Sequence, residues 1–223
     1  MINSREACPE ARARAEGYWF LAGFFANAPS ADFLKSVVVA YSGDGADDHA
    51  KVVQLHWKLR DLILSESADA LVQRLAPESI RLFGGLHPGY GPPPPYESAY
   101  VGGQSMGDVT LSVVDAFEEA GMGSLDTSHG PCDHICSELK FMAALCVKED
   151  EAWTANGAEA AVVWLNRQRA FLQAHILNWL PGWRSKVFEA TDENYFLLAV
   201  ELALAACQAD AEIVQKRIEL SRY

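Results

Sequence analysis

The stretch "CDHICSE", residues 132 to 138, contains side chains that can bind metals or transfer protons. Cys132, His134, Cys136 and Glu138 follow one another at two-residue steps, and thiolates with an imidazole are good zinc ligands. On a helix, two-residue steps point side chains about 200° apart, so these four could converge on a metal only if the segment were extended. No second Cys/His pair at zinc-finger spacing follows. A metal-dependent hydrolase that uses His134 and Glu138 with the nearby thiols is kept as the alternative interpretation.

A helix is predicted to begin within the same stretch. Asp133 stands where its carboxylate can accept the free amide hydrogens of the first helical turn. His134 and Glu138 are four residues apart and therefore share a face. The adjoining face carries an apolar stripe formed by Ile135, Leu139, Met142 and Cys146. The His134–Glu138 pair is open to three interpretations: a general base with its partner, a pair of ligands, or a hydrogen-bonded pair on the surface.

The stretch "YGPPPPYESAY", residues 90 to 100, is the second candidate. A polyproline ligand for an SH3-like groove is one interpretation, and a linker between domains is another. Successive prolines restrict their own backbone and that of each preceding residue, so such a loop loses little entropy when it is ordered. Glu97 is then held in place, and a helical turn would let Tyr96 and Tyr100 face the same way. We favour a stiff loop that presents these residues.

The elements that must position these residues are helices, because apolar residues recur at three- and four-residue steps. The fold class is all-α: a single helical-bundle domain, residues 1–223, of roughly eight to ten helices with one long ordered Pro/Gly-rich loop at about 84–107. Pro77 is expected to separate two short helices, and Pro181 to end the penultimate long one. The predicted helices cover about 9–27, 31–41, 48–64, 68–75, 77–83, 107–120, 133–152, 157–179 and 192–219.

Composition restricts the class of partner. With 18 basic and 30 acidic residues the net charge is −12, so nucleic acids and anionic membranes would be repelled and a cationic partner suits the chain better. Five cysteines, an odd number, argue against a disulfide framework and for a reducing cytosol. We expect no stable membrane insertion, because no apolar run approaches the ~20 residues of a membrane span.

The N-terminal run "YWFLAGFF" resembles the apolar part of a secretory signal, and three arginines precede it. Glu6, Glu10 and Glu16 neutralise that basic region, and the same residues fit an amphipathic helix. We therefore expect a helix of the domain rather than a cleaved signal. Common enzyme signatures such as a Gly-rich phosphate loop, Gly-x-Ser-x-Gly and His-Glu-x-x-His do not occur in the sequence.

Four stretches together are similar to the TorD/DmsD/NarJ family of redox-enzyme maturation chaperones. They are "YWFLAGFFANAPSADFL", "RLFGG…PPPPYESAY", "DHICSELKFM" and "FLQAHILNWLPGW". They occur in the same order as in the family, and together they span nearly the whole chain. One position departs from the family's pattern: Cys132 stands where the family often has proline directly before the Asp-His pair, and Pro131 comes one residue earlier.

The resemblance implies a cytoplasmic all-helical chaperone with no catalytic turnover, no catalytic residues and no cofactor or metal of its own. It implies that the partners are the twin-arginine leader and the catalytic subunit of a molybdopterin oxidoreductase of anaerobic respiration, held while the cofactor is inserted. Carried over by position, the residues expected at the signal-peptide-binding surface are Leu82, Phe83, Tyr96, Glu97, Ser98, Tyr100, Asp133, His134 and Glu138. Guanine-nucleotide binding, suggested for this family, has no phosphate loop here to support it.

The residues fit that partner. A twin-arginine leader is a pair of guanidinium groups followed by an apolar stretch, so its receptor needs carboxylates beside an apolar groove. Glu97, Asp133 and Glu138 are the candidate arginine acceptors, and we expect Glu97 and Asp133 to meet although they are distant in sequence. The chain is compatible with a monomer or with a domain-exchanged dimer.

Overall fold

The computed structural model describes residues 4–40, 51–85, 89–102, 107–123, 131–155 and 157–221. Over these residues the regular structure is helical, with an isolated antiparallel bridge between Tyr96 and His134, so the all-α prediction is confirmed. Among the described residues, no helix combines the length and the apolarity that crossing a bilayer requires.

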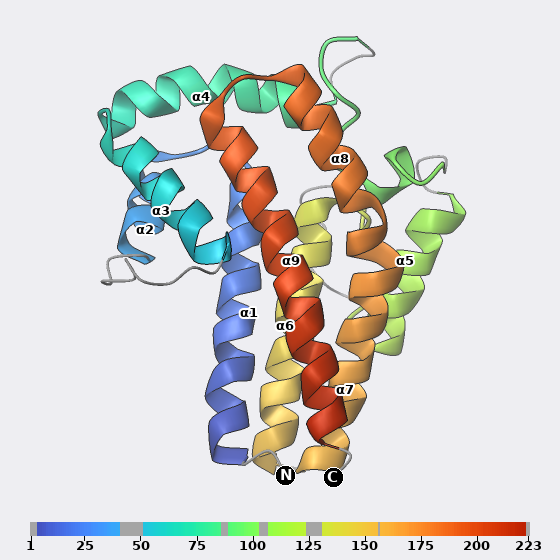
Figure 1. Cartoon of the computed structure of the whole chain (residues 1–223). Coiled ribbons are helices and arrows are strands. Elements are labelled where there is room, and N and C mark those ends of the chain that lie inside the picture. Colours follow the sequence, from blue (N-terminus) through green and yellow to red (C-terminus); the bar gives the residue numbers. More distant parts are fainter. Residues whose placement is uncertain are drawn as a thin grey trace. The chain divides into compact units, whose positions relative to one another are not determined.

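Long helices dominate the chain (Figure 1). In order they are α1 (Ser4–Ala26), α2 (Ala31–Ala40), α3 (Lys51–Leu64), α4 (Ala68–Phe83), α5 (Asp108–Glu119), α6 (Ile135–Ala155), α7 (Ala158–Phe171), α8 (Leu177–Ala190) and α9 (Asn194–Leu220). Two short turns accompany them, a 3₁₀ turn η2 (Glu97–Ala99) and a π-helical turn η3 (Leu172–Ile176).

The chain divides into two compact units. Unit 1 comprises Met1–Ala22, Tyr96–Leu180 and Cys207–Tyr223; unit 2 comprises Gly23–Pro95 and Pro181–Ala206. Three of the boundaries fall inside the helices α1, α8 and α9. The single-domain organisation stays a prediction, and the two units are described separately below.

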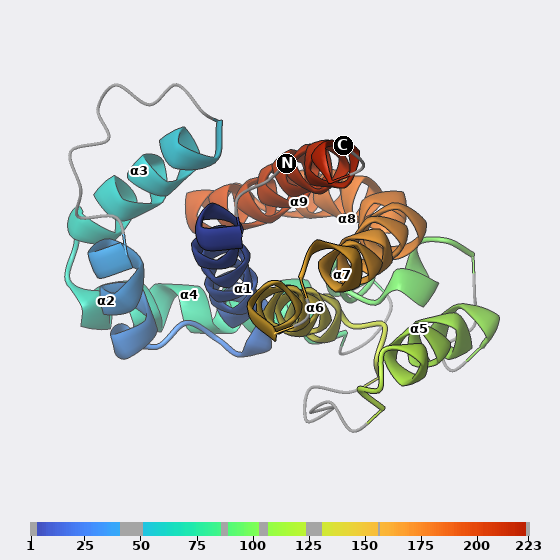
Figure 2. The ribbon, with the colours of Figure 1, turned by 90° about the horizontal axis from the view of Figure 1, so that it is seen from below.

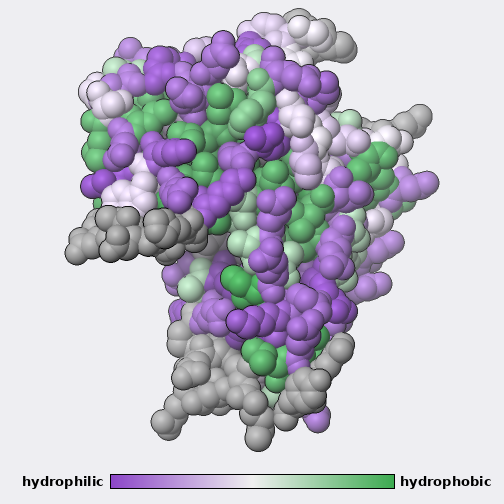
Figure 3. All heavy atoms as spheres, in the orientation of Figure 1, coloured by the Kyte–Doolittle hydropathy of each residue, from purple (hydrophilic) through white to green (hydrophobic). Residues whose placement is uncertain are grey.

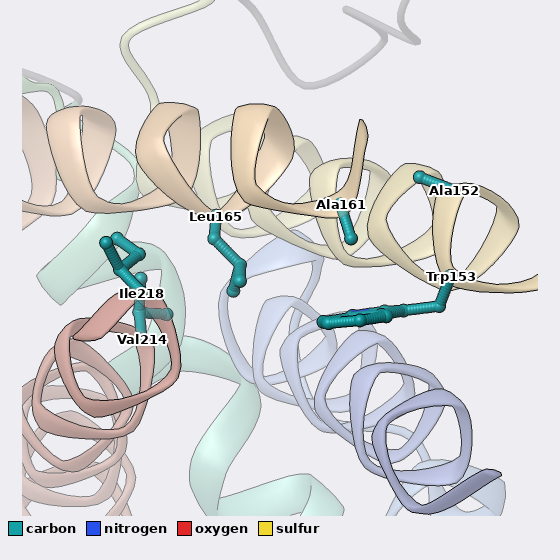
Figure 4. Packing of buried hydrophobic residues seen from close by; sticks show 6 residues of the cluster. All are labelled: Ala152, Trp153, Ala161, Leu165, Val214 and Ile218. Carbon is teal, nitrogen blue, oxygen red and sulfur yellow. The ribbon is translucent and has the colours of Figure 1, made fainter. Parts of the chain in front are cut away.

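Unit 1 is a bundle of α6, α7 and the parts of α1 and α9 that belong to it, which run side by side (Figure 2). The apolar stripe predicted on α6 is confirmed, because Ile135, Leu139, Met142 and Cys146 are fully buried. A further apolar cluster from α6, α7 and α9 is shown in Figure 4: Ala152, Trp153, Ala161, Leu165, Val214 and Ile218. Burial of such faces stabilises the bundle by roughly 25 cal/mol per Å² of apolar surface.

α5 packs on this bundle through aromatic rings. The ring of Phe117 stacks on that of Phe141, with 4.2 Å between their centroids. Phe171 of α7 meets Phe141 edge-on at 4.7 Å. Such contacts are typical of close aromatic packing in cores, and they connect α5 to α6 and α7.

Polar side chains are buried within the same bundle. The guanidinium of Arg14 donates to Asp210 (Nε to Oδ1, 2.5 Å), to Glu149 (Nη1 to Oε2, 2.8 Å) and to Gln168. Tyr18 donates its hydroxyl hydrogen to Asp210 at 2.7 Å. One arginine of α1 therefore connects α6, α7 and α9.

Unit 2 has an aromatic core. The ring of Phe25 lies 5.1 Å from that of Trp183 and 5.8 Å from that of Phe83. Phe83 also meets Phe196 edge-on at 5.4 Å. These rings come from the parts of α1, α4, α8 and α9 that belong to this unit.

Two proline predictions are wrong. Pro77 lies inside the continuous helix α4 and does not separate two helices. The loss of one backbone hydrogen bond is offset there by an apolar face, since Leu71, Leu75 and Leu82 are fully buried. Pro181 likewise lies inside α8. The π-helical turn η3 comes shortly before it, and such turns change the hydrogen-bond register of a helix locally.

The backbone of the proline loop approaches α4 closely in unit 2. A Cβ atom at Gly91 would lie 2.0 Å from the carbonyl oxygen of Arg81. We expect Gly91→Ala to lower the free energy of unfolding by about 1–3 kcal/mol, because the backbone must move apart. Gly17→Ala in α1 is the control. Apart from its chain neighbours and the backbone of its own helix, no atom lies within 4 Å of the place that a Cβ at Gly17 would take, and alanine should stabilise the helix by about 0.5–1 kcal/mol. Urea unfolding followed by circular dichroism measures both, and equal effects would contradict the close approach.

Candidate functional site

The proline loop meets the start of α6 in unit 1. The backbone N–H of Glu97 donates to the carbonyl of Asp133 at 2.8 Å, and the N–H of Ser98 donates to its Oδ2 at 3.1 Å. Tyr96 and His134 form the antiparallel bridge. The expectation that Glu97 and Asp133 meet is confirmed.

The cap of α6 differs from the prediction. The first helical hydrogen bond runs from the N–H of Glu138 to the carbonyl of His134, so His134 occupies the N-cap position. Its Nδ1 accepts the N–H of Cys136 at 3.1 Å. The carboxylate of Asp133, one residue too early in the chain to serve as this cap, accepts the loop's amide at Ser98 instead.

Glu97 is buried against the π-helical turn. Its side chain is 3% exposed, and its Oε2 lies 2.9 Å from Nδ1 of His175. The η2 turn directs Glu97 inward, while η3 brings His175 to meet it. A π turn inserts one extra residue into a helix and occurs frequently at functional sites.

Glu138 is fully buried beside this pair. The indole N–H of Trp179 donates to its Oε2 at 3.0 Å. Burial, and next the negative charge of Glu97, raise the pKa of Glu138 well above its usual value, while the bond from Trp179 opposes this shift. When protonated, Glu138 can donate its own hydrogen to Glu97. Because His134 and Glu138 are both buried, the interpretation as a surface pair is wrong.

The carboxyl groups outnumber the basic groups at this site. Glu97, Asp133 and Glu138 lie together, and His175 is the basic group paired with Glu97. Among the described residues, none donates a hydrogen bond to Oδ1 of Asp133 or to Oε1 of Glu138. Within the described part of the chain, each of these two carboxyl groups therefore has one buried oxygen without a donor, which is costly, so the cluster has unused capacity to bind a cation or a proton.

The two tyrosines cover the cluster. The ring of Tyr96 meets that of His134 edge-on at 5.0 Å, and the ring of Tyr100 stacks on Trp179 at 5.6 Å. Both tyrosines are half-buried, whereas Ser98 is buried between them. In this closed arrangement the carboxyl groups are covered by the loop.

The other two predicted residues belong to unit 2. Leu82 is fully buried there, and Phe83 packs against Trp183 and Phe196. Their contacts are those of core residues. Their assignment to a binding surface stays a prediction.

The sequence profile of the nitrate reductase delta subunit family matches residues 46–185, more than half of the chain. The chain belongs to this family. The resemblance to the TorD/DmsD/NarJ family is thereby confirmed.

Several relatives of this family member are named chaperones. It is 30% identical to the chaperone protein TorD of Photobacterium profundum over 119 residues, which are 52% of this chain and 54% of that protein. It is 25% identical to TorD of Vibrio parahaemolyticus over 211 residues, 89% of this chain and 93% of that protein. A chlorate reductase assembly chaperone protein of Ideonella dechloratans is 40% identical over 63 residues, 28% of this chain and 31% of that protein. The chain therefore spans about half the length of the first relative and nearly all of the second.

In this family member the structure adds two residues to the site. His175 and Trp179 contact Glu97 and Glu138, and the sequence prediction included neither. Both lie in the stretch "FLQAHILNWLPGW", which offered a signal. The π turn that contains His175 has no recognisable sequence pattern.

A small cavity adjoins His175. It has a volume of about 140 Å³ and is lined mainly by the apolar side chains of α5, α6 and α7, including Phe141 and Phe171. Over the described part of the chain, no group of three or more His, Cys, Asp and Glu residues is arranged to hold a metal ion. The site is a covered carboxyl cluster, and His175, which contacts Glu97, also lines this small cavity.

Proposed function

We propose that this member of the family is a cytoplasmic chaperone that binds the twin-arginine leader of a molybdopterin oxidoreductase subunit and assists its assembly before export. The names of its relatives support an assembly role. The observation that carries the leader part is the cluster of Glu97, Asp133 and Glu138, in which acidic groups exceed basic ones.

Arginine capture requires the loop to open. Within unit 1, residues 96–100 are held by two amide hydrogen bonds to Asp133, by the Tyr100–Trp179 stack and by the Glu97–His175 contact. When these contacts are released, a guanidinium can donate to the carboxylates, and each such charged hydrogen bond contributes about 1.5–3 kcal/mol. The leader's arginines thereby replace the groups that cover the cluster in the closed form.

The net charge of −12 should increase the rate at which the protein and a cationic leader associate. A cationic leader is attracted to an acidic protein, and added salt screens this attraction over about 10 Å at 0.1 M. We therefore expect association to slow as salt increases. The buried contacts are screened less and should largely set the rate of dissociation.

The test is calorimetry with a synthetic peptide that carries an Arg-Arg pair followed by an apolar stretch. Glu97→Gln and Asp133→Asn should each weaken binding by about tenfold or more, the loss of one charged hydrogen bond. Both replacements keep the size of the side chain, and in Asp133→Asn the side-chain amide oxygen can still accept the N–H of Ser98. Glu118→Gln, on the exposed face of α5, should leave the affinity unchanged.

A second peptide with Gln-Gln in place of Arg-Arg separates charge from apolar contact. It should bind the unchanged protein at least as weakly as the Arg-Arg peptide binds Glu97→Gln, because it loses the charged hydrogen bonds to every carboxylate of the cluster. If all combinations bind equally, the carboxyl cluster does not recognise the arginines, and only an apolar mode of binding would remain.

A further inference from the structure

A second and larger hollow lies in unit 1, between α1 and α6 and beside the end of α5. Its volume is about 850 Å³. Trp19 and Phe20 of α1, Val147 of α6 and Met122 after α5 supply its large apolar side chains. We call this hollow the α1–α6 groove. In Figure 2 these two helices run side by side.

The floor of the groove is made of small residues. Ala15 of α1 and Ala143 and Ala144 of α6 line it, and small side chains let the backbone of another helix approach closely. On α6 the lining runs from Lys140 to Glu151, which at 1.5 Å per residue is about 16 Å, or three helical turns. The groove is therefore long enough to bind a short helix.

Large apolar side chains are left exposed in the groove. Trp19 is 62% exposed and Val147 is 45% exposed. By contrast, hydrophilic side chains predominate over the C-terminal part of α9 on the face seen in Figure 3. Adjoining exposed apolar residues with a polar rim are typical of a surface that binds another protein.

The rim of the groove reverses the charge of the chain. It carries three basic residues, Arg12, Lys140 and Lys148, and two acidic ones, Glu16 and Glu151, whereas the chain as a whole has 18 basic and 30 acidic residues. Each acidic residue already has a basic neighbour: Glu16 lies 4.0 Å from Arg12, and Glu151 lies 2.8 Å from Lys148. The ammonium group of Lys140 lies over the Trp19 ring at 5.4 Å.

The basic residues stand on both sides of the groove. Arg12 belongs to α1, and Lys140 and Lys148 belong to α6. On the α1 side, Arg12 is balanced by Glu16. On the α6 side, Lys140 and Lys148 exceed Glu151 and leave a net positive charge. A helix seated in the groove should therefore carry acidic residues on its flank toward α6, with bulky apolar residues at i, i+4 and i+7 facing the floor.

We propose that the α1–α6 groove binds an acidic-flanked amphipathic helix of a partner protein. The groove is separate from the carboxyl cluster, because Lys140, Ala144 and Val147 follow Glu138 at helical rotations of about 180–240° and so face the opposite side of α6. The groove and the cluster can be occupied at the same time. This binding surface goes beyond the proposed recognition of a leader, whose arginine pair would meet three cations here.

The test uses fluorescence anisotropy with two labelled helical peptides. Both carry leucines at i, i+4 and i+7; one has glutamates on its flanks and the other has lysines at the same positions. The glutamate peptide should bind at least tenfold more tightly than the lysine peptide. Trp19→Ala and Ala144→Arg should each weaken its binding at least tenfold, and Lys148→Glu should reduce the preference between the two peptides.

Val163→Ala is the matched control, because Val163 is an exposed apolar residue of unit 1 outside the groove. It should leave peptide affinity unchanged, and circular dichroism checks that every variant is folded. Equal affinity for both peptides, or retention of affinity in Trp19→Ala, would overturn the proposal.

Other occupants give different results, and each would also overturn the proposal. A second copy of the chain would appear as a dimer in analytical ultracentrifugation that Trp19→Ala dissociates. Vesicles of anionic lipid that bind in a Trp19-dependent way, when the glutamate peptide does not, would indicate a membrane. An Arg-Arg leader peptide whose binding depends on Trp19 but not on Glu97 would identify the groove as the leader site.

Discussion

Replacing Arg14 by methionine is expected to lower the free energy of unfolding by about 3–5 kcal/mol, the typical cost of removing one partner from a buried ion pair. The guanidinium of Arg14 is bonded to Asp210 and Glu149, and all three side chains are at most 8% exposed. Without it, two buried carboxylates of the bundle would lose a charged partner.

Arg217 does not replace Arg14 in this role. Its Nη2 lies 3.3 Å from Oε1 of Glu149, so it shares that carboxylate, and its Nη1 lies 3.0 Å from Oε2 of Glu10. Asp210 would retain the hydroxyl of Tyr18 as a donor, but a neutral donor compensates a buried charge poorly. Most of the lost stability should therefore come from Asp210, whose buried carboxylate would lose its charged donor.

Urea unfolding measures this effect, and Arg12→Met is the matched control. Arg12 is close by on the same helix segment, but its side chain is 74% exposed and its partner Glu16 is 4.0 Å away. Exposed pairs of this kind contribute about 0–1 kcal/mol. If Arg14→Met and Arg12→Met destabilise the protein equally, the buried network does not contribute as its geometry indicates.

Glu138→Gln is expected to make the protein more stable than the unchanged chain, and increasingly so as the pH rises above the pKa that Glu138 has in the unfolded chain. The pKa of Glu138 is raised in the folded state, mainly by burial and then by the charge of Glu97, whereas in the unfolded chain it is about 4.3. Between these values the folded state holds a proton that the unfolded state has released.

The sign of the pH dependence follows from this difference. The stability that the protonated form contributes is complete below the unfolded pKa and is lost as the pH rises through the folded pKa. Over that interval the free energy of unfolding should fall by up to about 1.4 kcal/mol per pH unit. The side chain of glutamine does not ionise, so the stability of the variant does not fall with pH for this reason.

Glutamine also preserves the contacts of the protonated form. Its amide oxygen can accept the indole N–H of Trp179, and its amide hydrogens can donate to Glu97. Other groups around Glu138 are Asp133, His134, His175 and Cys207; they are unchanged in the variant, so the difference between the two proteins isolates Glu138.

Urea titrations at several pH values measure the difference, with Glu151→Gln as a control on the exposed face of the same helix. The free energy of unfolding of the Glu151 variant should change with pH in the same way as that of the unchanged protein. If that of the Glu138 variant does the same, Glu138 is ionised in the folded state and the hydrogen that it shares with Glu97 is absent.

The local residue pattern was sufficient to predict most of the helices. The sequence also led to the correct expectation that the stretches around Glu97 and Asp133 lie together in the fold. The stripe from Ile135 to Cys146 is buried as its spacing indicated, because three- and four-residue periodicity is a property of the chain itself. The resemblance carried by the stretches around Glu97 and Asp133 placed the chain in its family, and these residues do meet.

The errors arose where contacts distant in sequence outweigh local preference. Pro77 and Pro181 interrupt isolated helices, but buried leucines around Pro77 and buried Leu180 and Trp183 around Pro181 keep both helices continuous. Asp133 has the composition of a helix cap, yet the loop at Ser98 offers its amide to the same carboxylate. Local propensities are small beside the energy of such packing and hydrogen bonding.

The helical class, the family and the residues of the carboxyl cluster could all be predicted from the sequence, since they depend on residue type, order and spacing. Three features became evident from the folded chain alone: the carboxyl groups are covered, His175 and Trp179 contact them, and a separate groove lies between α1 and α6. Burial and hydrogen-bond partners depend on segments far apart in the chain, and spacing along one segment does not encode which other segment will cover it.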